Sequence, residues 1–75
     1  MSDELWRVVL FHSTSHALRA ERVLQKAGIG CKLIPIPRHI SSDCGVCIRI
    51  VAGDEEPARQ ALHEAGVEIE AVRPV

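Results

Sequence analysis

Residues 5–34 read LWRVVLFHSTSHALRAERVLQKAGIGCKLI, and this stretch decides the fold. It opens at 5–11 with an almost continuous apolar run rich in β-branched residues, which predicts a central strand. A polar turn, HSTSH, follows at 12–16, and apolar residues then recur at helical spacing as far as Ala27. A second apolar run at 29–34 predicts another strand. The stretch therefore predicts a strand, a helix and a second strand in that order.

Capping residues mark both ends of the predicted helix. Ser13, Thr14 and Ser15 are natural N-caps, because a hydroxyl oxygen can accept a hydrogen bond from an amide of the first turn. Gly28 is a natural C-cap, because glycine adopts positive φ without strain. Pro35 marks the end of the following strand, since proline has no amide hydrogen to donate.

The second half of the chain again predicts a strand, a helix and a strand in that order. Apolar residues alternate with others over 46–51, which predicts a strand with one buried face. Asp54 is placed to cap a second helix, and Gly66 to end it. Alternation over 67–71 predicts the last strand.

The resulting order, β-α-β-β-α-β, is the ferredoxin-like arrangement of the α+β class. Right-handed crossovers give a four-stranded antiparallel sheet with strand order 4-1-3-2 and both helices on one face. Residues 1–75 are expected to form a single ferredoxin-like domain, because so short a chain supports only one core.

The sheet face without helices is expected to be solvated. Arg7 and Arg49 are placed there near two acidic residues of the last strand, Glu68 and Glu70. An alternative is that this open face mediates self-association into a homo-oligomer, through Val9 and Phe11.

Composition excludes several classes of protein. The formal net charge is -1 and only 3% of residues are aromatic, which argues against a nucleic-acid partner. Apolar runs are too short to span a bilayer, and acidic residues stand at positions 3 and 4, where a secretory signal would carry basic ones. A cytoplasmic protein without a membrane partner is expected. Three cysteines cannot all pair within one chain, which favours thiol, metal or redox chemistry.

The predicted topology brings two distant segments to one end of the sheet, the turn 12–16 and the loop 38–45. Cys44 should then lie near the first turn of the first helix, whose free amides favour a thiolate. Arg38 and a protonated histidine would lower the pKa of this thiol further. Cys44 is therefore the predicted reactive residue. The predicted binding residues for a small anion or a chalcogen atom are Ser13, Thr14, Ser15, His16, Arg38, His39, Ser41, Ser42 and Gly45.

Other interpretations of these residues remain open. The serines before the helix have a structural role as caps, and Cys31 and Cys47 are expected to be small apolar fillers of strands. Cys44 and Cys47 form a C-x-x-C that would bind a metal only together with histidines. A third reading is a regulatory module that binds a small anion at the start of the first helix.

Several motifs together resemble a known family. They are FHSTSHAL at 11–18 with AE at 20–21, AG at 27–28, IPIPR at 34–38 and ISSDCG at 40–45. In this order they resemble the selenium/sulfur carrier-like family over essentially the whole chain.

The resemblance implies that Cys44 holds sulfur or selenium as a persulfide or perselenide. The implied partner is a cysteine desulfurase or another enzyme that transfers selenium or sulfur. Such a protein is a carrier rather than an enzyme, and it needs no cofactor beyond the covalently held atom. Cys31 and Cys47 lie outside the motifs.

Overall fold

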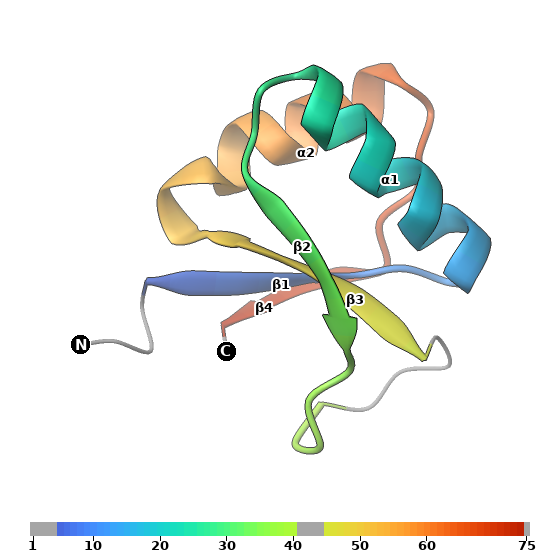
Figure 1. Ribbon diagram of the computed structural model, residues 1–75, viewed down its shortest axis with the longest axis vertical. Helices are drawn as coiled ribbons and strands as arrows, with labels where there is room; N and C mark the ends of the chain where they lie inside the picture. Colours follow the sequence, from blue (N-terminus) through green and yellow to red (C-terminus); the bar gives the residue numbers. More distant parts are fainter. Residues whose placement is uncertain (1–4, 41–44, 75) are drawn as a thin grey trace.

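A four-stranded antiparallel sheet carries two helices on one of its faces in the computed structural model (Figure 1). The structure describes residues 5–40 and 45–74. Its elements are β1 (Trp6–Leu10), α1 (Thr14–Lys26), β2 (Cys31–Pro35), β3 (Val46–Val51), the 3₁₀ turn η2 (Ala52–Asp54), α2 (Glu55–Glu64) and β4 (Ala71–Pro74). The strand order is β2-β3-β1-β4, which is the predicted order counted from the other edge. The ferredoxin-like prediction is confirmed.

Helix α1 begins and ends where its capping residues predict. Ser13 is the N-cap, and its side chain accepts a hydrogen bond from the His16 amide. Gly28 follows the helix with φ +76°, a backbone conformation that residues with a Cβ rarely adopt. Ala17 and Leu24 lie on the buried stripe of the helix. The capping residues therefore set where α1 begins and ends, and the packing of its buried stripe sets its position.

The main core lies between the sheet and the helices. Val9 of β1 and Phe11, just after β1, both contribute to this core. The other large members are Ile48, Leu24 and Leu62. The prediction that Val9 and Phe11 occupy the open face is therefore wrong. Because the run 5–11 is apolar at nearly every position, its pattern does not show which alternate residues face the helices.

A second, smaller apolar cluster lies on the other face of the sheet. Its buried members are Val8, Leu10 and Cys47, and Ile36 and Ile40 pack against them from the segment that follows β2. This face is thus partly covered by the protein's own chain. Both faces of β1 are buried from Val8 to Leu10 as a result, which explains why this part of its sequence shows no alternation.

The last strand begins later than predicted. Val67 is buried in the main core and only 4% exposed, and β4 starts at Ala71. The Glu70 amide donates a hydrogen bond to the Leu10 carbonyl at 2.8 Å and leads the chain into the sheet. Residues 67–70 alternate because Val67 and Ile69 pack under the helices, so the alternation marks a packed connection.

Arg7 and Arg49, the basic residues predicted on the open face, have surroundings in the structure that the sequence does not predict. Arg7 Nε lies 3.4 Å from the Glu55 carboxylate of α2, and the Arg7 backbone pairs with Pro74 of β4. Arg49 stacks instead over the Trp6 ring, with its Cζ 4.3 Å from the ring centroid. The later start of β4 removes both expected acidic partners from the strand.

The two edge strands, β2 and β4, each end on a proline, Pro35 and Pro74. Neither α1 nor α2, the α-helices of the described part of the chain, is long and apolar enough to cross a membrane.

Candidate functional site

The turn after β1 and the start of β3 lie at the same end of the sheet. β1 and β3 are antiparallel, and Val9 pairs with Ile48. The chain therefore leaves β1 for α1 at the end where Gly45 leads into β3. Gly45 is exposed. The described parts of the two predicted site segments thus approach the sheet from one end.

Ser13 and His16 form a compact capping arrangement at the start of α1. Ser13 Oγ lies 2.6 Å from His16 Nδ1 and also accepts a hydrogen bond from the His16 amide at 3.3 Å. The hydroxyl oxygen accepts from the amide, and the direction of its hydrogen bond with Nδ1 depends on which ring nitrogen carries the proton. The Ser13 hydroxyl is therefore engaged by its own helix. Thr14 and Ser15 follow it on the exposed first turn.

The segment that follows β2 is tied at its base. The Ile36 amide donates to the Gly45 carbonyl at 3.4 Å, and the Ile40 amide donates to the Pro37 carbonyl at 3.0 Å. The first bond joins the two ends of the loop, and the second makes a tight turn within it. Arg38 and His39 are exposed on this turn.

The described site residues fall into two groups on opposite sides of the sheet. Ser13 to His16 lie on the side of the helices, whereas residues 36–40 extend to the other side (Figure 1). Ser41, Ser42 and Cys44 lie outside the described residues. Their position relative to either group stays a prediction.

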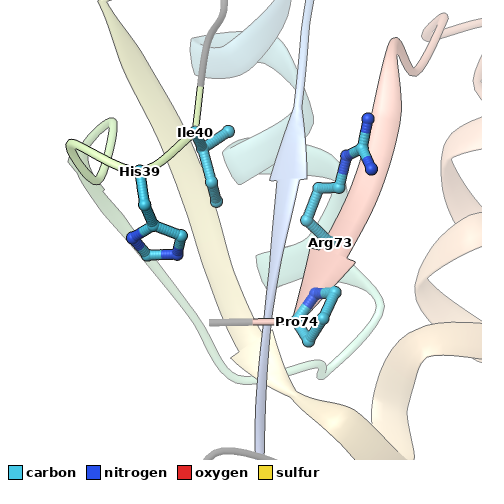
Figure 2. Close-up of a pocket in the computed structure, with 4 residues that line it drawn as sticks. All are labelled: His39, Ile40, Arg73 and Pro74. Carbon is cyan, nitrogen blue, oxygen red and sulfur yellow. The ribbon is translucent and has the colours of Figure 1, made fainter.

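A shallow cavity of about 410 Å³ adjoins the second group. Figure 2 shows His39 and Ile40 on one side of it and Arg73 and Pro74 of β4 on the other. Sequence pattern alone does not single out Arg73, because only the register of β4 against β1 places it on this face. The polar lining is cationic or titratable, and the other two residues are apolar.

The two described cysteines have poorly reactive surroundings. Cys47 is 0% exposed within the second apolar cluster, and its Sγ lies 3.9 Å from the Pro35 carbonyl. Cys31 packs against the main core, and burial, followed by the negative charge of Glu21, raises the pKa of its thiol. A thiol with a raised pKa is less often the reactive thiolate at neutral pH. Both residues fit the predicted role of apolar fillers.

The described histidine, cysteine and acidic side chains form no group of three or more that could hold a metal ion. Cys47, one half of the C-x-x-C, is enclosed by apolar side chains. A metal centre that used Cys47 would require this cluster to open.

The comparison with known families covers nearly the whole molecule. A family described as "Putative Se/S carrier protein-like" matches residues 7–74. The chain belongs to this family.

A curated relative agrees over part of the chain. The Uncharacterized protein YtiA of Escherichia coli (strain K12) is 41% identical over 39 residues, which are 52% of this chain and 46% of that protein. The match thus spans about half the length of the relative. No solved structure matches the chain significantly.

The Se/S carrier-like match includes every candidate site residue, from Ser13 to Gly45. The family description names a cargo but assigns no residue to hold it. The choice between the three cysteines therefore depends on their chemistry in this chain.

Proposed function

We propose that this member of the Se/S carrier-like family carries sulfur or selenium on Cys44, as a persulfide or perselenide. The observation that supports this choice is the state of the other two thiols. Cys47 is 0% exposed, and the pKa of Cys31 is raised by burial and by Glu21. Neither is suited to attack a donor in solution, which leaves Cys44 as the acceptor.

Loading requires no oxidant from the protein. The Cys44 thiolate attacks the outer sulfur of a donor persulfide, a bond forms between the two sulfurs, and the donor's S–S bond breaks. The donor cysteine leaves as a thiolate and the outer sulfur remains on Cys44. The same exchange passes the atom to an acceptor thiolate. The donor in this proposal is a cysteine desulfurase or another enzyme that transfers sulfur or selenium.

The surroundings of Cys44 in this proposal come from both ends of its loop. Arg38 is exposed and has no partner among the described residues, so its guanidinium can face the terminal anion. Gly45 adjoins the sulfur-bearing residue, and its carbonyl is held by the Ile36 amide. Ser41 and Ser42 are proposed to hold the loop by hydrogen bonds. The start of α1, from Ser13 to His16, lies at the same end of the sheet but on its helix side, and its partial charge is the more distant contribution in this proposal.

The proposal is tested by loading the protein with sulfur. Purified protein is incubated with a cysteine desulfurase and cysteine, and its intact mass is measured without reductant. The wild type should gain sulfur, and the gain should disappear on treatment with a thiol reductant. Cys44→Ser should gain none.

Cys31→Ser is the matched control and should load like the wild type, since Cys31 is partly buried and has a raised pKa. Equal loading of Cys44→Ser and the wild type, or no loading of the wild type, would contradict the proposal.

A further inference from the structure

Three basic residues form a row across the sheet face opposite the helices. Lys32 of β2 pairs with Arg49 of β3, Arg49 pairs with Val8 of β1, and Val8 pairs with Arg73 of β4. All four project to the side of the second apolar cluster, because they alternate with residues of the main core. Neighbouring strands are about 5 Å apart, so the row extends over about 15 Å.

No negative charge from the strands offsets this row. The four strands contain no Asp or Glu at all. The acidic residues of the described chain stand on the helices or on the connections beside them: Glu21, Asp54, Glu55, Glu56, Glu64, Glu68 and Glu70. The described carboxylates therefore lie away from this row, although the helices carry basic residues as well and the formal net charge is -1. His39 lies across the cavity from Arg73 (Figure 2).

An exposed apolar group lies next to the row. Leu5, Trp6 and Val51 are 57%, 38% and 45% exposed, and Trp6 pairs directly with Val51 across the two central strands. Arg49 covers the Trp6 ring, and its buried Nε has no hydrogen-bond partner among the described residues. The stacking contact is already formed in the chain by itself, so the binding of a partner need not create it.

We infer that this face, defined by Lys32, Arg49, Arg73, Trp6 and Val51, docks an acidic segment of a partner protein. Charge complementarity selects the segment, because an acidic chain meets three cations and no carboxylate from a strand. Tryptophan and arginine are the residues that most often carry binding energy at protein interfaces. The inference holds whether or not Cys44 carries a chalcogen atom.

Single-stranded nucleic acid fits this face less well. Such ligands need open aromatic rings on which bases stack. Trp6 is the one aromatic residue in the four strands, and the Arg49 guanidinium covers its ring.

The position of Trp6 provides the experiment. It is the only tryptophan in the chain, so its fluorescence reports on this face alone. The probe is a short tryptophan-free peptide of glutamates with a central leucine pair, titrated at low and at high NaCl. The fluorescence should change saturably, and the affinity should fall as salt screens the charges.

Charge-reversal variants locate the binding surface. Lys32→Glu combined with Arg73→Glu should weaken binding by about tenfold or more. The matched control reverses two exposed charges of α1, Arg22→Glu with Lys26→Glu, and should change affinity by less than about twofold. If the first pair fails to fold, Lys32→Gln with Arg73→Gln provides the same comparison.

Four results would overturn the inference. They are no fluorescence change with the peptide, equal weakening in both double variants, tighter binding of an oligothymidine than of the peptide, and a dimer in sedimentation that must dissociate before the peptide binds. Binding that appears only after Asp3→Asn with Glu4→Gln would also overturn it, since the chain's own acidic start would then occupy the face.

Discussion

At the scale of single residues, the cysteines differ more in their surroundings than in their spacing along the chain. Cys31 Sγ lies 3.9 Å from the Glu21 carbonyl, and the partial burial of Cys31 is the main cause of its raised pKa. The Glu21 carboxylate raises this pKa further, because its negative charge opposes ionisation of the thiol. Cys31 is therefore protected by a charge as well as by packing.

This dual cause gives a prediction for alkylation. In a Cys44→Ser background, Cys31 should react with iodoacetamide with a midpoint at higher pH than a free cysteine. Glu21→Gln should move the midpoint towards lower pH, because only the charge is removed. Glu64→Gln on α2 is the control and should leave it unchanged. Mass spectrometry of the Cys31 peptide across pH measures the midpoint, and an unchanged midpoint in Glu21→Gln would contradict the role of the carboxylate.

The raised pKa of Cys31 also makes the free energy of unfolding depend on pH. Because the pKa of Cys31 is raised in the folded state, the folded protein keeps this proton at a pH where the unfolded chain has lost it. This contribution of the Cys31 thiol to the free energy of unfolding is present below the thiol pKa of the unfolded chain, about 8.5, and is lost as the pH rises beyond that value. Cys31→Ala should therefore show a smaller loss of unfolding free energy in this alkaline range.

At the scale of elements, the segment 36–40 acts as a cover for one face of the sheet. Ile36 and Ile40 close the second cluster over Val8, Leu10 and Cys47. Among the described residues, the backbone hydrogen bonds of the cover are one at its base and one in its turn, in contrast to the repeated bonds of a helix. Such a segment opens more readily than the main core does.

Truncating the Ile40 side chain of this cover should expose the Cys47 thiol. In a Cys44→Ser background, Ile40→Ala should increase the reaction rate of Cys47 with a disulfide reagent by about tenfold, since one apolar contact fewer holds the segment closed. Leu18→Ala is the control, because Leu18 is 44% exposed on α1. Equal rates in the two variants, measured under native conditions, would show that Cys47 is reached by another route.

The sequence predicts the elements better than it predicts what lies on their faces. Ser13 and Gly28 mark α1 correctly because capping is a local interaction. The side that Val9 presents was predicted wrongly because the second cluster depends on Ile36 and Ile40, which contact β1 only in the folded chain. The start of β4 was also missed, since a packed connection and a strand show the same alternation. The proximity of Cys44 to α1 remains a prediction.

At the scale of the whole molecule, stability depends on a small main core. Phe11, Leu24, Ile48 and Leu62 are its largest fully buried members beside Ile50. A chain of 75 residues buries only about two thirds of its surface or less, and its free energy of unfolding lies at the lower end of about 5–15 kcal/mol. One large-to-small substitution in the main core therefore removes a substantial share of the free energy of unfolding.

Two leucines of α1 make a matched test. Leu24 is 0% exposed and Leu18 is 44% exposed on the same helix. Leu24→Ala should lower the free energy of unfolding by about 2–5 kcal/mol, because it leaves a cavity. Leu18→Ala should change it by about 0.5 kcal/mol or less. Urea unfolding followed by circular dichroism measures both, and similar midpoints for the two variants would mean that the main core is not the principal source of stability.

The prolines that end β2 and β4 have a consequence for how copies of the molecule meet. A growing fibril recruits new chains by pairing backbone amides along an unprotected sheet border. Pro35 and Pro74 each remove one such amide from the two outer strands, and β4 is only 4 residues long. Concentrated solutions of this protein should therefore form no amyloid fibrils, even though β1 carries apolar side chains on both of its faces.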